Sequence, residues 1–191
     1  MKIMNVLVTG IGGPTAQGIM QGLLDKENVR IVGADRRSIT SGNQFCEKVY
    51  QIPALSETEQ YQRAILGIVE EEDIDAIFPA LHEEIEVYES FRERVPSKVA
   101  LPKAPLFDIL INKESVYHYL KEIGLNQHIP EYYGFSRSEE LREIINECFP
   151  NETYTVVKQL NGHGSLGFAI LADRDNFLKA LKNDEKKVVN I

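Results

Sequence analysis

The chain has 191 residues, 43% hydrophobic and 26% charged, which predicts one globular domain, or one domain and part of another. A net charge of −8 argues against nucleic-acid binding, because phosphate contacts require clustered Lys and Arg. No apolar run approaches transmembrane length and no signal-peptide pattern opens the chain, so we expect a cytoplasmic protein without membrane attachment.

In the first half, short apolar runs alternate with helically spaced apolar residues, which predicts a β-α-β order. Such an order implies a parallel sheet with helices on both faces and right-handed crossovers. The predicted strands are 5–9, 30–34, 48–52, 75–78 and 99–101, and the predicted helices are 14–24, 57–71 and 83–94.

The run Pro102-Lys103-Ala104-Pro105 interrupts the chain, and we place the boundary between two domains there, 1–104 and 105–191. After it, Gly124 is expected to end a helix, and Ser136 to Glu139 reads as a capping box. The predicted helices are 106–111, 113–123, one from that box to about 148, and 175–182 with Asp173 as its cap; the predicted strands are 132–135, two flanking the loop at 162–167, and one beginning at 188.

The two cysteines, Cys46 and Cys148, lack Cys-x-x-Cys partners and are expected to be reduced thiols. The histidines are scattered without ligand spacing, so no metal site is predicted within this sequence.

A first glycine loop, Gly10-Ile11-Gly12-Gly13, follows the first predicted strand. A dinucleotide fingerprint occupies this position, although Thr15 replaces its third glycine, and Asp35 ends the second strand where a ribose-binding acid would lie. Three interpretations stay open: an NAD(P) site, a tight turn for helix–strand packing, and a substrate-binding loop at the carboxyl ends of the strands.

A second glycine-rich loop gives the strongest functional signal. Val156-Val157-Lys158 precedes it, an apolar run from Phe168 follows it, and the loop itself reads Gly162-His163-Gly164-Ser165-Leu166-Gly167. Glycine amides can approach a phosphate closely, and the lysine supplies the counter-charge. The lysine precedes the loop and a strand-like run follows it, so the pattern is not a Walker A motif and instead suggests a strand–loop–strand ATP-binding flap.

The order of these features resembles the ATP-grasp superfamily, in particular carboxylate–amine ligases like the carbamoyl-phosphate synthase large subunit. The resemblance implies an α/β, Rossmann-like pre-ATP-grasp domain followed by the first α+β ATP-grasp subdomain, apparently truncated. It further implies that ATP phosphates contact Lys113, Lys158 and the flap residues Gly162, His163, Gly164, Ser165 and Gly167. The chain departs from the family at Asn112, Gln159 and Ser165, where aspartate, proline and glycine are frequent.

The resemblance also suggests substrate-binding residues in the first domain. Related proteins often place an acidic residue after the fourth strand, and we choose Glu84 over Glu83; the alternative is a carboxylate favoured by the helix dipole. The substrate-side candidates are Gly10, Gly12, Gly13, Asp35 and Glu84, and no catalytic residue is assigned.

The implied reaction is ATP-dependent activation of a small-molecule carboxylate to an acyl phosphate, then attack by an amine or similar nucleophile. Mg²⁺ would assist, with ligands expected beyond Ile191, so we expect the chain alone to be inactive. Two alternatives are a Rossmann-type NAD(P)-dependent oxidoreductase and a non-catalytic nucleotide-binding module. The acceptor, the nucleophile and the oligomeric state are not encoded in recognisable motifs.

Overall fold

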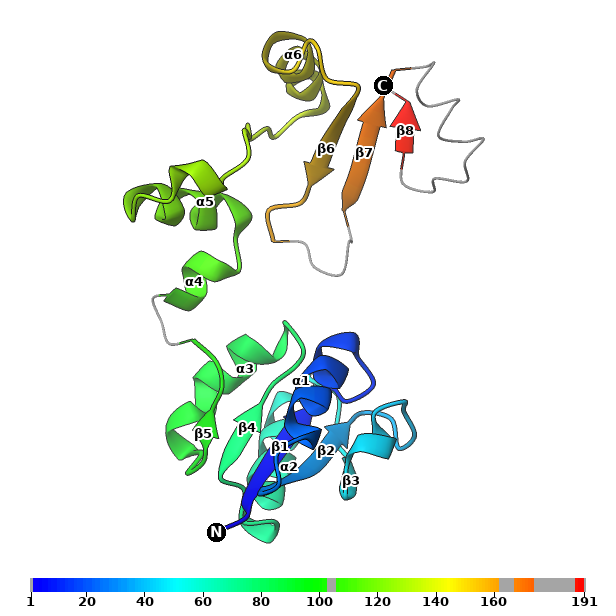
Figure 1. Cartoon of the computed structure of the whole chain (residues 1–191), viewed down its shortest axis with the longest axis vertical. Helices are drawn as coiled ribbons and strands as arrows, with labels where there is room; N and C mark the ends of the chain where they lie inside the picture. The colour runs from blue at the N-terminus through cyan, green and yellow to red at the C-terminus, as the bar shows by residue number, and fades with distance from the viewer. Residues whose placement is uncertain (1, 103–105, 162–166, 174–187, 191) are drawn as a thin grey trace. The chain divides into compact units, whose positions relative to one another are not determined.

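Figure 1 shows the computed structural model of the chain, which describes residues 2–102, 106–161, 167–173 and 188–190. Internal contacts divide the chain into two compact units, Met1–Pro102 and Lys103–Ile191. Each unit carries a sheet of its own and is described separately below.

The first unit is a five-stranded parallel sheet in the order β3-β2-β1-β4-β5, which confirms the predicted α/β class (Figure 1). Its central strand pairs Val6 with Ile31 on one side and with Ala76 on the other. The elements are β1 (Met4–Thr9), α1 (Pro14–Leu24), β2 (Val29–Asp35), β3 (Lys48–Gln51), α2 (Thr58–Glu71), β4 (Ala76–Phe78), α3 (Glu84–Phe91) and β5 (Lys98–Val99), with 3-10 turns at Asn43–Phe45 and Arg92–Arg94.

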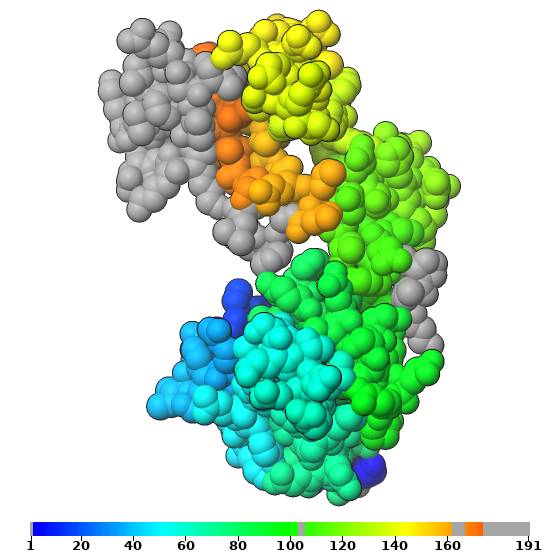
Figure 2. All heavy atoms as spheres, turned by 180° about the vertical axis from the view of Figure 1, so that it is seen from behind, coloured from blue at the N-terminus to red at the C-terminus, as the bar shows by residue number. Residues whose placement is uncertain are grey.

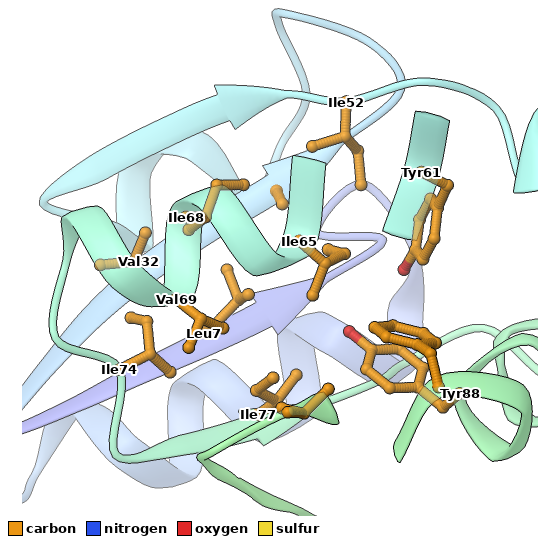
Figure 3. Packing of buried hydrophobic residues seen from close by; sticks show 13 residues of the cluster. Leu7, Val32, Ile52, Tyr61, Ile65, Ile68, Val69, Ile74, Ile77 and Tyr88 are labelled. Atoms are coloured by element: carbon orange, nitrogen blue, oxygen red, sulfur yellow. The ribbon is translucent and has the colours of Figure 1, made fainter. Parts of the chain in front are cut away.

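Both faces of this sheet are covered by helices. Alternate β1 residues point to opposite faces, so Val6 and Val8 pack against α1 while Leu7 packs against α2 and α3. Figure 3 shows the cluster around Leu7, between the sheet and the helices α2 and α3. In it, the rings of Tyr61 and Tyr88 meet edge to face with centroids 6.4 Å apart. Burial on both faces explains why the strands read as near-continuous apolar runs.

The strand order reverses beside β1. From β1 the chain builds β2 and β3 on one side, and then returns to build β4 and β5 on the other. The carboxyl ends of β1 and β4 therefore flank the topological switch point, where open α/β sheets bind ligands. Thr9 ends β1 there, and Leu81 and Glu84 follow the end of β4.

The second unit contains helices and a three-stranded sheet in the order β6-β7-β8. β6 and β7 form the predicted antiparallel hairpin, pairing Lys158 with Phe168 and Val156 with Ile170, and β8 joins β7 in parallel. The elements are α4 (Leu106–Leu110), α5 (Lys113–Glu122), α6 (Ser138–Cys148), β6 (Tyr154–Lys158), β7 (Phe168–Ala172) and β8 (Val188–Asn190), with a 3-10 turn at Asn126–His128.

Two local predictions for this unit are wrong. Residues 132–135 form no strand; Tyr132 packs on Tyr117 with centroids 4.7 Å apart, and Tyr133 meets Phe149 at 5.5 Å. The aromatic side chains that suggested a strand are thus packed against other aromatic rings, outside any sheet ladder.

The capping residues of α6 are shifted by one position from the predicted box. Helix α6 begins at Ser138, and the carboxylate that accepts the backbone N–H groups of Ser136 and Arg137 belongs to Glu140, not Glu139. Gly124, with φ of 78°, follows the end of α5 as predicted. The predicted helix 175–182 lies outside the described residues.

Candidate nucleotide site

Lys158 ends β6 on an exposed face of the hairpin. Residues paired across antiparallel strands share a face, so Lys158 lies beside Phe168, and Val156 beside Ile170. The Lys158 ammonium is 5.9 Å from the centre of the Phe168 ring. Val156, on the same face, is 50% exposed, which leaves an apolar surface that ends in a cation.

Lys113 reaches the same end of β6 from the start of α5. Asn112 caps this helix, because its Oδ1 accepts the backbone N–H groups of Glu114 and Ser115, both at 3.0 Å. The Lys113 ammonium donates to the carbonyl oxygens of Gln159 at 2.8 Å and Leu160 at 3.1 Å. The structure therefore brings the two lysines that were predicted from distant segments to one place.

Both lysines line a groove of about 560 Å³ in the second unit. Figure 2 shows it as a hollow among the green α5, the yellow α6 and the orange hairpin. Its walls are mostly aromatic and aliphatic, among them Tyr117, Phe135, Ile144, Val156 and Phe168. The charged residues of the lining also include Glu114, Glu131 and Glu152. The two lysines can supply counter-charge for the phosphates of a nucleotide, and the apolar wall offers a surface for its base.

The predicted flap residues Gly162, His163, Gly164 and Ser165 lie outside the described residues. Gly167 is described, and its φ of 64° favours glycine. Its carbonyl accepts the N–H of Gln159 at 3.1 Å, which joins the two ends of the loop.

The first glycine loop is tied to the chain's own groups. One oxygen of Asp35 accepts the Gly12 N–H at 2.9 Å, and the other accepts the Arg37 N–H at 3.0 Å. The Arg37 guanidinium also lies 3.6 Å from this carboxylate. A Cβ added at Gly12 would collide with the Arg37 guanidinium. These contacts give Asp35 a structural role in shaping the loop, although each of its oxygens keeps a further acceptor site.

Glu84 is buried at the switch point, with only 1% of its surface exposed. Its carboxylate accepts hydrogen bonds from the Thr9 hydroxyl at 2.7 Å, the Tyr61 hydroxyl at 2.5 Å and the Leu81 N–H at 3.0 Å. Burial raises the pKa of Glu84, although these hydrogen bonds act in the opposite direction. The carboxylate thus links β1, α2 and the segment after β4.

Leu81 and Tyr61 were not singled out by sequence reasoning. A Cβ added at Gly10, whose φ is 61°, would lie 2.7 Å from Leu81 Cγ, so Leu81 covers the first turn of the loop. Tyr61 has the helical spacing of a core residue, and nothing in its neighbourhood in sequence signals a bond to Glu84.

Among the residues that the structure describes, no three His, Cys, Asp or Glu side chains cluster as metal ligands would. In the same parts of the chain, no helix combines the length and apolar character that crossing a bilayer requires. The described cysteines are free thiols, and burial raises the pKa of Cys46 to about 11.

The doubly wound sheet followed by the lysine-bearing hairpin is the fold of a pre-ATP-grasp domain and a first ATP-grasp subdomain. Residues 6–99 match the family model described as the PylC-like N-terminal domain. The predicted resemblance to ATP-grasp ligases is thereby confirmed, for the N-terminal part of such a protein. Comparison with curated proteins gave no match.

Solved structures extend the similarity of fold to nearly the whole chain. An N5-carboxyaminoimidazole synthetase from Staphylococcus aureus, complexed with ADP, matches 98% of the chain with a TM-score of 0.63 at 12% identity. The biotin carboxylase domain of the Hydrogenobacter thermophilus 2-oxoglutarate carboxylase matches 96% with a TM-score of 0.58 at 15% identity. An L-amino acid ligase from Bacillus licheniformis matches 96% with a TM-score of 0.56 at 16% identity.

The chain spans less than half the length of these proteins: 46% of the synthetase, 41% of the carboxylase domain and 42% of the amino acid ligase.

Proposed function

We propose that the chain is the N-terminal, nucleotide-binding part of an ATP-dependent ligase that joins a small-molecule carboxylate to an amine or similar nucleophile. The observation that carries the proposal is that Lys113 and Lys158 line the same largely apolar groove, with the Lys113 ammonium bound to the carbonyl of Gln159, the residue after Lys158. Activation through an acyl phosphate suits such a site, because phosphoryl transfer is catalysed mainly by positioning and charge neutralisation.

In this proposal the second unit holds ATP. The Lys158 ammonium binds phosphate oxygens, and the face around Val156 and Phe168 takes the base and excludes water. Mg²⁺, when bound, would neutralise further phosphate charge; we assign it no ligand among the described residues. The flap glycines Gly162, Gly164 and Gly167 remain our candidates for amide contacts to phosphate.

We assign the first unit to the acceptor substrate, at the switch point of its sheet. Asp35 and Glu84 accept hydrogen bonds from the chain's own groups, so we assign them the task of shaping the loop around Gly10, Gly12 and Gly13. The ligase would act in the cytoplasm, as the sequence predicts. The similarity to a carboxylase domain and an amino acid ligase supports carboxylate chemistry without naming the acceptor.

Calorimetric titration with ADP tests the nucleotide site. A charged hydrogen bond contributes about 1.5–3 kcal/mol, so Lys158→Met should weaken ADP binding about tenfold or more. Lys26→Met, which removes an exposed lysine of the first unit, should leave the affinity unchanged. Binding of NADP in place of ADP would overturn the proposal in favour of the oxidoreductase.

A non-catalytic nucleotide-binding module remains the second candidate, because the lysines and groove require only binding. Release of phosphate from ATP separates the two functions. The full-length protein should release phosphate from ATP when an accepted carboxylate and an accepted amine are both present. ADP binding without any such release across a library of both substrates would favour the module.

A further inference from the structure

Three consecutive amides of the first glycine loop donate to acceptors of the chain itself. A glycine loop that binds an anion instead points its N–H groups at the ligand. Because each amide has one hydrogen to donate, these three have none left for an anionic ligand. The bonds run from the Ile11 N–H to the Ala34 carbonyl at 3.4 Å, from the Gly12 N–H to the Asp35 carboxylate at 2.9 Å, and from the Gly13 N–H to the Gly10 carbonyl at 2.9 Å.

The Arg37 guanidinium lies directly over this loop. A Cβ added at Gly12 would overlap with Nη2 of Arg37, so the absence of a side chain at Gly12 makes room for the guanidinium. In a dinucleotide fold, the second glycine of the loop lets a pyrophosphate approach the backbone. Here the same space holds a cation of the chain, which can bind an anion where the loop amides cannot.

The guanidinium keeps its donors for a ligand. Asp35 lies 3.6 Å from Nε of Arg37, and within the described parts of the chain the guanidinium makes no hydrogen bond. The Arg37 side chain is 63% exposed, whereas that of Asp35 is 9% exposed and accepts the backbone N–H groups of Gly12 and Arg37. Since a guanidinium offers a planar fork of N–H groups, the outward-facing end of Arg37 matches a carboxylate or a phosphate.

The segment that carries this guanidinium is fixed against the glycine loop. Oδ1 of Asn43 accepts both the N–H of Thr40 at 2.9 Å and its hydroxyl at 2.8 Å. A Cβ added at Gly12 would lie 3.2 Å from Cβ of Thr40, so Thr40 also covers the loop. The Gln17 amide of α1 donates to the Ser41 hydroxyl at 2.6 Å. Only the arginine side chain therefore remains to be ordered when an anion binds.

We propose that Arg37 binds a negatively charged group of the acceptor substrate, a carboxylate or a phosphate, at the carboxyl edge of the first sheet. This inference rests on the proposed function, because that function assigns the first unit to the acceptor. It adds the chemical class of the substrate: the acceptor carries an anionic group, and a guanidinium recognises that group in place of the glycine-loop amides.

Titration of the chain with succinate and with inorganic phosphate, followed by NMR without nucleotide, tests the site. At least one anion should shift the Arg37 Nε–H signal and the Gly12 and Gly13 amide signals until they saturate, and the anion that binds more tightly identifies the group. Arg37→Met should weaken this binding about tenfold or more, because the charged hydrogen bonds to the anion are lost. Arg36→Met, which removes the same charge from an exposed neighbour, is the matched control and should keep the affinity.

Gly12→Ala separates the position of the guanidinium from its charge. The variant keeps every charged group but displaces Arg37, so its anion affinity should fall toward that of Arg37→Met. Equal affinities of Arg37→Met and Arg36→Met, or no saturable shift with either anion, would overturn the proposal.

NADP is the competing ligand for this arginine, because an arginine near the ribose accommodates the 2′-phosphate in NADP-binding folds. NADP that binds more tightly than both small anions, and loses this binding in Arg37→Met, would overturn the assignment to an acceptor. Absence of ADP binding by the chain would instead overturn the proposed function and not the anion site, since the anion titrations contain no nucleotide.

Discussion

Two buried carboxyl groups of the first unit have opposite environments. Glu84 meets only uncharged donors, and burial raises its pKa. Glu72 contacts the ammonium of Lys48, the hydroxyl of Tyr50 and the guanidinium of Arg30, and these partners lower its pKa to about 2. Stability should therefore respond to pH in opposite directions at the two residues.

Glu84 should make the protein less stable as pH rises. Its folded pKa lies above the unfolded value of about 4.3, so the stability it contributes is complete below that value and is lost as pH rises through the folded pKa. Glu84→Gln should remove this slope from the free energy of unfolding measured in urea. The same slope in both proteins would contradict the assignment.

Truncation at the same position should be costly. Glu84→Ala leaves the Thr9 hydroxyl, the Tyr61 hydroxyl and the Leu81 N–H without their acceptor. Unsatisfied buried groups cost about 1–3 kcal/mol each, so we expect destabilisation of about 3 kcal/mol or more. Urea unfolding of the variant measures this, and a loss below about 1 kcal/mol would show that the cluster relaxes or admits water.

Glu72 should stabilise the protein at neutral pH and lose that contribution in acid. Its contribution is present above the unfolded pKa of about 4.3 and is lost as pH falls through about 2. Glu72→Gln should therefore be less stable than the unsubstituted protein at neutral pH, and the difference should shrink in acid. Glu70→Gln, at an exposed neighbour on α2, is the control and should leave the acid limb of a pH-dependent unfolding curve unchanged.

Among the elements, two glycines with opposite surroundings test the packing around the first loop. A Cβ at Gly42 would collide with the backbone carbonyl of Ile11, inside that loop, whereas a Cβ at Gly67 on α2 would meet nothing within 4 Å. Gly42→Ala should cost about 1–3 kcal/mol from overpacking. Gly67→Ala should raise the free energy of unfolding by about 0.5–1 kcal/mol, because alanine is more favourable than glycine in a helix interior. Thermal unfolding of both variants should show opposite shifts.

The sequence predicts the regular elements well and the contacts between them poorly. The apolar run 5–9 and the helical spacing in 57–71 predict a strand and a helix correctly, because helices cover both faces of the sheet and bury these residues. The strand predicted at 132–135 is wrong because aromatic residues are common both in strands and in packed ring pairs. Contacts with Tyr117 and Phe149, which lie far away in the sequence, decide between the two. Lys113 and Lys158 could be chosen from sequence order, but the bonds of Lys113 to Gln159 and Leu160 could not.

For the whole molecule, we propose that the two units have different tasks. The first matches the PylC-like N-terminal domain over residues 6–99, and the fold of nearly the whole chain recurs in a synthetase, a carboxylase domain and an amino acid ligase of low sequence identity. The two glycine loops, one in each unit, are the competing nucleotide sites that the sequence offers. Their locations in separate units make them distinguishable by where a nucleotide protects the backbone.

Hydrogen exchange of the intact chain with and without ADP tests the central claim most directly. ADP should slow exchange in β6, β7 and the described residues 159–161 of the second unit, and leave the Gly10 to Gly13 loop unchanged. NADP should protect neither region. Protection confined to the first glycine loop, by either nucleotide, would contradict the assignment of the lysine-bearing hairpin as the nucleotide site.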